Sequence, residues 1–246
     1  MNAEELVSIA CPKIANMGWA FYFVPETFAR GEELGLDGIS FYMMGRGGVL
    51  GDVEAPVIAS AFGFFNPNLV ASMWDAAKKI VEPRVAGHAY MECCANFGRS
   101  RFAGVAGLDA FCEAAGAVND AADPFGLALY SGIMAEPLVD DLAGRAMQLV
   151  TVLREFRGSA HIVALRATGL EAKVAHHIYR PDDGALFGWS EDEAPKISDE
   201  DRGLWKKAEA LTDRIVLPAY SVIDDAGRHS LVAGLEAMES ALAATA

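Results

Sequence analysis

Basic side chains are scarce in this sequence. Of its 246 residues only 20 are Lys or Arg, whereas 34 are Asp or Glu, so the formal charge is −14 at pH 7. Proteins bind nucleic acid largely by placing Lys and Arg against phosphates, so this charge argues against a nucleic-acid partner. Hydrophobic residues make up 52% of the chain. That content excludes a disordered protein and is enough for the core of a large globular domain.

Cysteine is also scarce, and its spacing does not indicate a metal site. No two of the four cysteines form a C-x2-C pair, and two of them are adjacent, where a disulfide would strain the backbone. These residues are Cys11, Cys93, Cys94 and Cys112. We expect reduced thiols in the core. His88-x3-Glu92 is a single pair without a third ligand, so the sequence predicts neither a metal nor another cofactor.

Long apolar runs and targeting features are missing as well. The N-terminal MNAEELVSIACPK has no basic n-region, and the apolar stretches 19–24 and 39–44 are too short to span a bilayer. We therefore expect a cytoplasmic protein that does not enter a membrane.

Apolar residues recur at helical spacing, and alternating strand patterns are absent. Leu138 to Phe156 gives the clearest amphipathic stripe, and Gly158 is expected to interrupt this helix so that Ser159 caps the next one. Asn66-Pro67, Asp123-Pro124, Pro83 and Pro137 are typical of helix starts. The other expected helices are Glu26–Gly35, Val53–Phe62, Leu69–Val81, Pro83–Phe97, Leu108–Val118, Pro124–Met134, Ala160–Ala167, Leu170–Tyr179, Asp199–Ile215 and Gly227–Ala243. The predicted fold class is mainly α.

A polar stretch at 180–184 is typical of a loop between packed units. We therefore predict a multi-helix N-terminal bundle over residues 1–183, which would bind a ligand, and a small helical C-terminal region over 184–246. No internal repeat is evident.

Arg46 is the first candidate site residue, because it stands between glycines in an apolar segment, Phe41 to Leu50. Glycine on both sides would let the backbone approach a ligand closely, and a buried guanidinium needs an acceptor. That acceptor is either internal, such as Asp37 or Asp52, or a carboxylate or enolate of a ligand.

A second candidate group lies between residues 153 and 161. Arg154 and Arg157 occupy adjacent turns, and His161 is expected in the first turn of a new helix, whose dipole would keep the imidazole neutral. Such a group can hold an anion and move a proton. Alternatively, the arginines pair with acids such as Glu155 or Glu171 and His161 is a structural histidine. His176 is expected to face inward from the following helix.

Three aromatic clusters complete the candidate site. They cover residues 19–23, 41–42 and 62–65, and such clusters usually form core. If a pocket opens between them, it is apolar with a few polar points. Its predicted ligand-binding residues are Arg46, Arg154, Tyr22, Tyr42, Phe65 and Asn66, and the predicted catalytic residues are His161, Arg157 and His176.

Several segments in a fixed order resemble a largely uncharacterised bacterial family of helix-turn-helix proteins that is common in actinomycetes. They are Phe21-Tyr-Phe-Val-Pro-Glu26, Gly45-Arg-Gly-Gly-Val-Leu-Gly51, Ala61-Phe-Gly-Phe-Phe-Asn-Pro67, Leu153-Arg-Glu-Phe-Arg-Gly-Ser-Ala-His161, Gly188-Trp-Ser-Glu-Asp-Glu193 and Leu211-Thr-Asp-Arg214. The resemblance implies a helical N-terminal domain joined to a degenerate winged helix. It does not assign an activity to the chain. Arg46, Arg154, Arg157, His161 and His176 stand at matching positions.

The chain departs from that family in two places. It is shorter between Trp189 and Leu211, where a recognition helix and wing would lie, and residues 186–217 hold five basic against eight acidic side chains, a charge of −3. We therefore expect the DNA-reading element to be absent. The family also tends to have histidines where Gln148 and Phe156 stand here.

These features predict a small-molecule-binding protein, acting as a metal-free acid–base enzyme of the lyase, isomerase or hydrolase type on a small apolar or aromatic anion. The alternatives are a ligand-sensing winged-helix transcriptional regulator and a non-catalytic carrier. A homodimer is expected, and nucleic acid is not expected as a partner.

Overall fold

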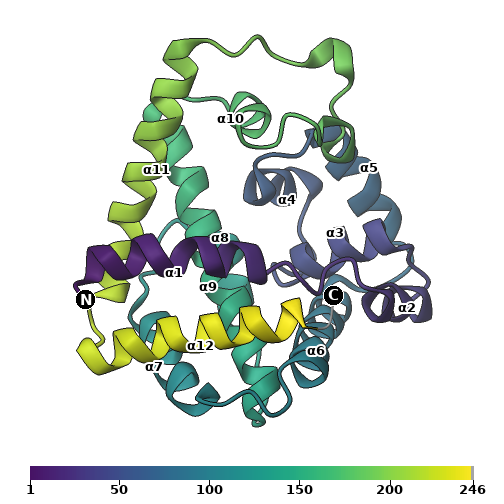
Figure 1. Ribbon diagram of the computed structural model, residues 1–246. Coiled ribbons are helices and arrows are strands. Elements are labelled where there is room, and N and C mark those ends of the chain that lie inside the picture. The colour runs from purple at the N-terminus through teal and green to yellow at the C-terminus, as the bar shows by residue number, and fades with distance from the viewer. Residues whose placement is uncertain (245–246) are drawn as a thin grey trace.

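The computed structural model describes residues 1–244, and this part of the chain contains twelve α-helices, two short 3-10 helices and no strand (Figure 1). The elements are α1 Ala3–Met17, α2 Pro25–Glu33, α3 Gly38–Gly48, α4 Ala55–Phe62, α5 Pro67–Ala77, α6 Pro83–Arg101, α7 Leu108–Ala121, α8 Ala128–Met134, α9 Leu142–Thr168, α10 Ala172–Tyr179, η1 Gly184–Phe187, η2 Glu191–Glu193, α11 Asp199–Tyr220 and α12 Asp225–Ala243. The mainly α prediction is confirmed.

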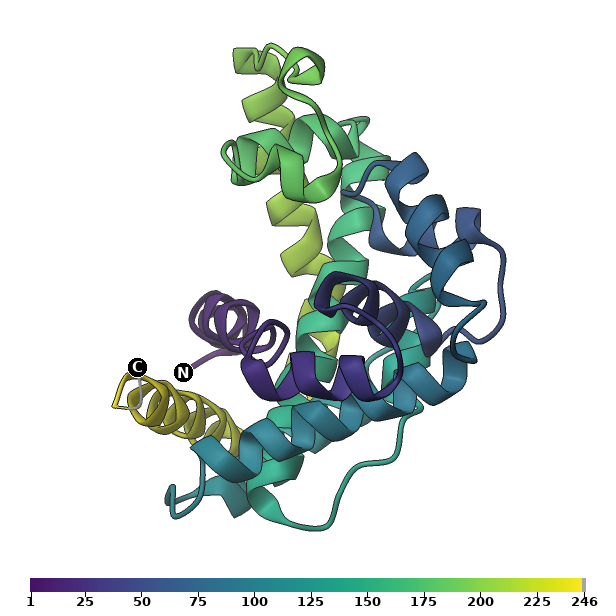
Figure 2. The ribbon, with the colours of Figure 1, turned by 90° about the vertical axis from the view of Figure 1, so that its right-hand side faces the viewer.

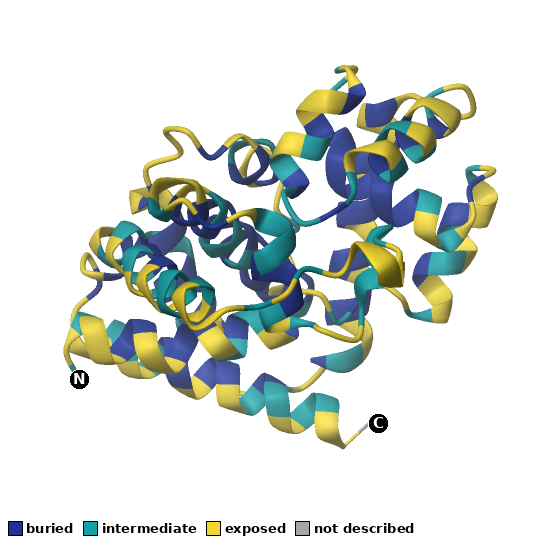
Figure 3. Cartoon of the chain, turned by 90° about the horizontal axis from the view of Figure 1, so that it is seen from above, coloured by how far each residue is buried: buried dark blue, intermediate teal, exposed yellow. Residues whose placement is uncertain are grey.

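Helix α9 is the central element, and α1, α6, α7, α8, α10 and α11 all pack against it. It crosses the molecule from the lower helices to the upper end, where α10 and the first half of α11 lie (Figures 1 and 2). Buried residues follow the inward faces of the helices and exposed ones the outward faces (Figure 3). Apolar burial around α9 is therefore what organises the fold.

The prediction of a helix break at Gly158 is wrong, because α9 continues through it for 27 residues. The helix also begins later than predicted, at Leu142, where the side chain of Asp141 accepts a hydrogen bond from the Gly144 N–H. A glycine lowers helix propensity by only about 1 kcal/mol, which the packing on both sides of α9 outweighs. Gly169, in a left-handed conformation, ends the helix as predicted.

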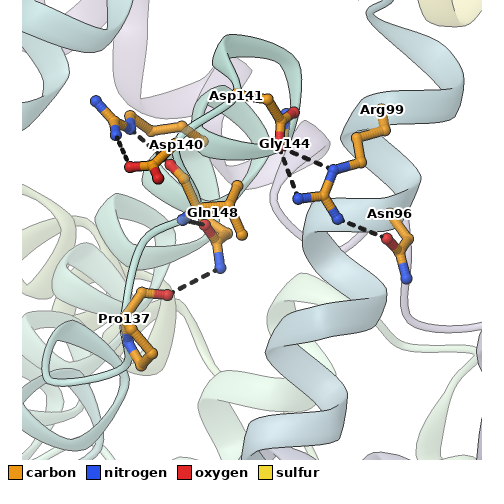
Figure 4. Close-up of polar contacts among 9 residues, drawn as sticks. Asn96, Arg99, Pro137, Asp140, Asp141, Gly144 and Gln148 are labelled. Atoms are coloured by element: carbon orange, nitrogen blue, oxygen red, sulfur yellow. Dashed lines mark hydrogen bonds and ion pairs between the residues drawn. The ribbon is translucent and has the colours of Figure 1, made fainter.

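The segment before α9 is held by side chains of the helix itself (Figure 4). Gln148 accepts from the Val139 N–H and donates to the Pro137 carbonyl, while Arg99 from α6 pairs with Asp141. Pro137 therefore lies in a loop and does not start a helix. Gln148 therefore has a structural role here.

Two helices were not predicted, and one predicted start is displaced. The chain forms α1 and α3 in addition to the expected helices, and α8 begins at Ala128 because Asp123 and Pro124 form a turn in which the Asp123 side chain accepts from the Phe125 N–H. Ser198 caps α11 and Asn66 caps α5, as predicted. The four cysteines are free and buried, also as predicted.

The first and last helices of the described chain, α1 and α12, pack against each other (Figures 1 and 2). Lys13 pairs with Glu239, and Leu231 and Leu235 of α12 belong to the same apolar core as Leu6 and Phe111. A division of the chain at residue 183 stays a prediction.

Candidate functional site

A cavity of about 430 Å³ lies where α1, α3, α9, α10 and α11 meet. Aromatic and aliphatic side chains form most of its wall, including Trp19, Phe62, Phe64, Phe187 and Trp205. Small-molecule sites typically have this size and this mixture of apolar wall and few polar groups. All the predicted site residues except Asn66 line it; they are Tyr22, Tyr42, Arg46, Phe65, Arg154, Arg157, His161 and His176.

Arg46 reaches this cavity from α3, and its partner is Glu155 of α9. The guanidinium donates from Nε to Oε1 (3.0 Å) and from Nη2 to Oε2 (2.8 Å), and Nη1 donates to the Tyr42 hydroxyl at 3.1 Å. Such a bidentate ion pair fixes the orientation of both side chains. Asp37 and Asp52, named as partners from sequence, are engaged elsewhere: Asp37 caps α3, and Asp52 pairs with Lys78.

The glycines around Arg46 serve helix packing. A Cβ at Gly45 would meet the ring of Tyr90, and one at Gly48 would collide with the Pro83 carbonyl of α6. The expectation that these glycines bring backbone against a ligand is therefore wrong; they bring α3 against α6.

Glu155 collects four hydrogen bonds although it is fully buried. Besides the two from Arg46, it accepts from Arg154 Nη1 at 2.5 Å and from the Tyr22 hydroxyl at 3.1 Å. Burial by itself would raise the pKa of Glu155, but the Arg46 and Arg154 guanidinium groups lower it to about 2. Two guanidinium groups thus face one carboxylate, which leaves this end of the cavity with a charge of +1. We call these three side chains the cationic pole.

Part of the Arg154 guanidinium group is not hydrogen-bonded to described residues. Within the described part of the chain, only its Nη1 hydrogen-bonds to protein, to Glu155 and to Tyr22, and the side chain lines the cavity. Burial raises the pKa of the Tyr22 hydroxyl, so Tyr22 stays protonated. A ligand anion at the cationic pole would find unpaired N–H groups on Arg154 and the compensating charge.

His161 lies on the same face of α9, nearer its C-terminal end, and contacts α11. Its Nδ1 is 2.9 Å from the Thr212 hydroxyl, which itself donates to the Ala208 carbonyl at 2.7 Å. A hydroxyl carries a single proton. Nδ1 must therefore be the protonated nitrogen, and Nε2 keeps a bare lone pair.

That Nε2 atom is buried and has no hydrogen-bond partner among the described residues, and Glu209 Oε1 is 3.6 Å away. Burial lowers the pKa of His161, although the Glu209 carboxylate opposes this effect. The imidazole is neutral because it is buried in mid-helix; the predicted helix N-terminus does not exist at this position.

Arg157 is held away from the cationic pole. Its Nη2 donates to Glu209 (2.8 Å) and to Asp213 (3.0 Å), both on α11. Arg154 and Arg157 therefore do not form one anion grip: Arg154 belongs to the cationic pole, and Arg157 ties α9 to α11. With one guanidinium against two carboxylates, this group of side chains carries a charge of −1, and of the two carboxylates only Glu209 lines the cavity. We call His161, Arg157, Glu209 and Asp213 the acidic pole.

Three further buried polar atoms of lining residues, Arg157 Nε, Ser159 Oγ and His176 Nε2, have no partner within residues 1–244. His176 faces inward, as predicted, and its ring centroid is 4.2 Å from that of Phe187. Burial, with a smaller effect of neighbouring His177, lowers the pKa of His176 to about 4. An unpaired buried polar atom costs roughly 1–3 kcal/mol, so these atoms are candidate contact points for a bound molecule.

Asn66 does not line the cavity. Its amide donates to the Gly188 carbonyl at 2.9 Å, its backbone N–H donates to the Phe187 carbonyl, and Trp189 Nε1 donates to the Phe64 carbonyl. Asn66 thereby holds the η1 segment in place. Phe65 does line the cavity, with its ring 4.3 Å from that of Phe187.

The sequence-based site omitted Glu155, Ser159, Glu209 and Thr212. Glu155 and Ser159 are four residues apart and so share a helix face, a signal that was hidden by the assumed break at Gly158. Glu209 and Thr212 could be assigned only by knowing that α11 packs on α9.

No group of three or more His, Cys, Asp and Glu side chains that could hold a metal ion occurs within residues 1–244. Nor is any helix in this range long and apolar enough to cross a membrane.

A sequence model described as a helix-turn-helix family matches residues 11–246. No curated protein and no solved structure matches the chain. The family match contradicts the prediction of a metal-free acid–base enzyme, and it favours the regulator named as its alternative. Because the match extends over nearly the whole chain, this protein belongs to the helix-turn-helix family.

Proposed function

We propose that this protein is a ligand-sensing regulator, in which the cavity binds a small, largely apolar anion and α11 transmits its presence. The observation that carries the ligand part is the cavity itself, with an aromatic wall, a +1 charge and four buried polar atoms of its lining residues without partners among the described residues. The family to which the chain belongs supports the regulatory part.

Helix α11 is suited to transmit binding because it is part of both the cavity and the outer surface. Its inward residues Trp205 and Glu209 line the cavity, and Thr212 holds His161. A ligand that contacts His161 therefore acts on α11 directly. A regulator needs a helix whose position depends on occupancy.

The outer face of α11 is where we propose DNA contact. Lys206, Lys207 and Arg214 are exposed there and have no ion pair within the described range. With no strand among residues 1–244, this proposal assigns phosphate contact to a helix and none to a wing. The charge of −14 predicts weak, strongly salt-dependent binding, and a homodimer in the cytoplasm is part of the proposal because two-fold regulators read paired half-sites.

The DNA part is tested by fluorescence anisotropy with fragments of genomic DNA across a salt series. Removing one phosphate contact reduces the slope of log K against log salt by about 0.9. Lys206→Ala should reduce the slope by about that amount, whereas Lys79→Ala, an exposed unpaired lysine on the turn after α5, should leave it unchanged. Equal slopes for both variants would remove α11 as the contact.

The ligand part is tested by native mass spectrometry of the purified protein. We expect a bound small molecule in the wild type and in Arg99→Gln, whose arginine pairs with Asp141 away from the cavity. Arg154→Gln should lose it. Retention of the molecule by Arg154→Gln would contradict the assignment of the cationic pole.

A non-catalytic carrier is the second candidate, favoured by the net charge of −14. It predicts the same bound molecule and the same effect of Arg154→Gln, but no retention of any DNA fragment at low salt.

A further inference from the structure

The two ends of the cavity differ in charge and in hydrogen-bonding character, and residues of α9 contribute to both. The cationic pole combines Arg46 and Arg154 with Glu155, while the acidic pole combines Arg157 with Glu209 and Asp213. The cationic pole therefore has one positive charge without a counter-charge, and the acidic pole has unpaired hydrogen-bond acceptors.

The acidic pole presents two acceptors to the same point. His161 Nε2 is a bare lone pair, because Thr212 uses its only proton on Ala208 and so requires the proton of His161 on Nδ1. Glu209 Oε1 is 3.6 Å from that lone pair, too far for a mutual hydrogen bond, whereas Oε2 is occupied by Arg157. A group placed between two acceptors at this separation can donate to both if it is an amine with two protons, or to one of them if it is a hydroxyl with a single proton.

Along the axis of α9 the two poles are six residues apart, from Glu155 to His161, which is a rise of about 9 Å at 1.5 Å per residue. The space between them is walled by rings, among them Tyr22, Phe62 and Phe64. A planar aromatic body fits such a wall better than a flexible polar one.

We infer that the ligand is an aromatic acid that carries a hydrogen-bond donor, a hydroxyl or an amine, at the end opposite its carboxylate. The carboxylate lies at Arg154, where it supplies the missing negative charge, and the donor lies between His161 Nε2 and Glu209 Oε1. This inference rests on the proposed sensing function and specifies its ligand.

The test uses four probes of one size in isothermal titration calorimetry. 4-Hydroxycinnamate carries both groups and spans a length similar to the separation of the poles. Cinnamate lacks the donor, 4-methoxycinnamate keeps the oxygen without its proton, and 4-hydroxycinnamyl alcohol lacks the carboxylate. We expect 4-hydroxycinnamate to bind at least about tenfold more tightly than each of the other three, since a polar group left unpaired in a buried site is strongly penalised.

Variants at each pole test the two contacts of the ligand separately. His161→Asn keeps a donor for Thr212 and removes the acceptor at the Nε2 position, so it should bring the ratio between 4-hydroxycinnamate and cinnamate close to one. Arg154→Gln should weaken both acids alike and leave that ratio unchanged. Circular dichroism and the melting temperature verify that each variant is folded, and Glu209→Gln offers a second, independent reduction of the ratio.

The outcomes distinguish this inference from the proposed function. Equal affinity of the wild type for cinnamate and 4-hydroxycinnamate overturns the donor assignment, as does an unchanged ratio in both His161→Asn and Glu209→Gln. If no probe binds and mass spectrometry finds a co-purified molecule of other chemistry, the ligand class is wrong and the sensing function stands. If no probe binds and no molecule co-purifies, both fail.

Discussion

Replacing Glu155 by glutamine should destabilise this protein more than any surface substitution. The side chain is fully buried and accepts from Arg46, Arg154 and Tyr22. Glutamine keeps the shape but removes the charge, so the buried guanidinium of Arg46 and the part-buried one of Arg154 lose their counter-charge. Breaking a buried ion pair on one side typically costs about 3–5 kcal/mol.

The pKa of Glu155 gives a second measure of the same quantity. It is lowered to about 2 from an ordinary value of 4.5, and each pH unit corresponds to about 1.4 kcal/mol, so the folded state favours the ionised form by roughly 3 kcal/mol. Because the folded pKa is depressed, this stabilisation is present above about pH 4.5 and is lost as the pH falls toward 2.

The assay is urea unfolding at pH 7, followed by far-ultraviolet circular dichroism. We expect Glu155→Gln to lower the free energy of unfolding by about 3–5 kcal/mol with little change in the urea dependence. The double variant Arg46→Met with Glu155→Leu should lose less than the single variants Arg46→Met and Glu155→Leu added together. Each single variant leaves the other member of the Arg46–Glu155 pair without its partner, whereas the double variant does not. A loss below about 1 kcal/mol for Glu155→Gln would refute the view that this pair is buried and charged.

Three further results are expected. Gly48→Ala should destabilise the protein by at least about 1 kcal/mol, because the added Cβ collides with the Pro83 carbonyl. Gly116→Ala, with open space around its Cβ, should instead stabilise α7 by about 0.5–1 kcal/mol. Urea titrations of the two variants compare these effects, and equal effects would contradict the close α3–α6 contact. His176 is buried as the neutral form with a pKa of about 4, so the free energy of unfolding should fall by up to about 3 kcal/mol as the pH drops from 6.5 to 4. Unfolding measured across that range should show a smaller fall for His176→Leu than for the wild type. Identical pH profiles of the two proteins would refute the role of His176. Asp141→Ala should cost about 1 kcal/mol by removing the cap of α9, and a melting temperature equal to that of the wild type would contradict the cap.

Local sequence signals predicted much of the helical architecture. Apolar stripes, Ser198 and Asn66 as caps, and Gly169 as a terminator identified many of the helices, because these features act within a few residues. They failed at Gly158, where the local preference for a break is small and packing on either side of α9 outweighs it.

The candidate site shows the same division. Sequence alone singled out Arg46, Arg154, His161 and His176, because isolated cations and imidazoles in apolar segments need partners. It could not identify Glu155 as the partner of Arg46, since these residues are 109 positions apart, and within Arg-Glu-Phe-Arg a glutamate resembles a surface residue.

The sequence by itself determined that this protein is helical, acidic and poor in Lys and Arg. Its match to a helix-turn-helix family extends over residues 11–246. Composition, periodicity and capping are enough for that, because they depend on neighbours along the chain. Only the tertiary structure decided which charges meet. It put Glu155 between two arginines, turned Arg157 toward α11 and left the Nε2 atom of His161 without a partner in the described part of the chain. Those contacts join segments distant in sequence, and they arise only when the apolar faces of the helices are buried together around α9.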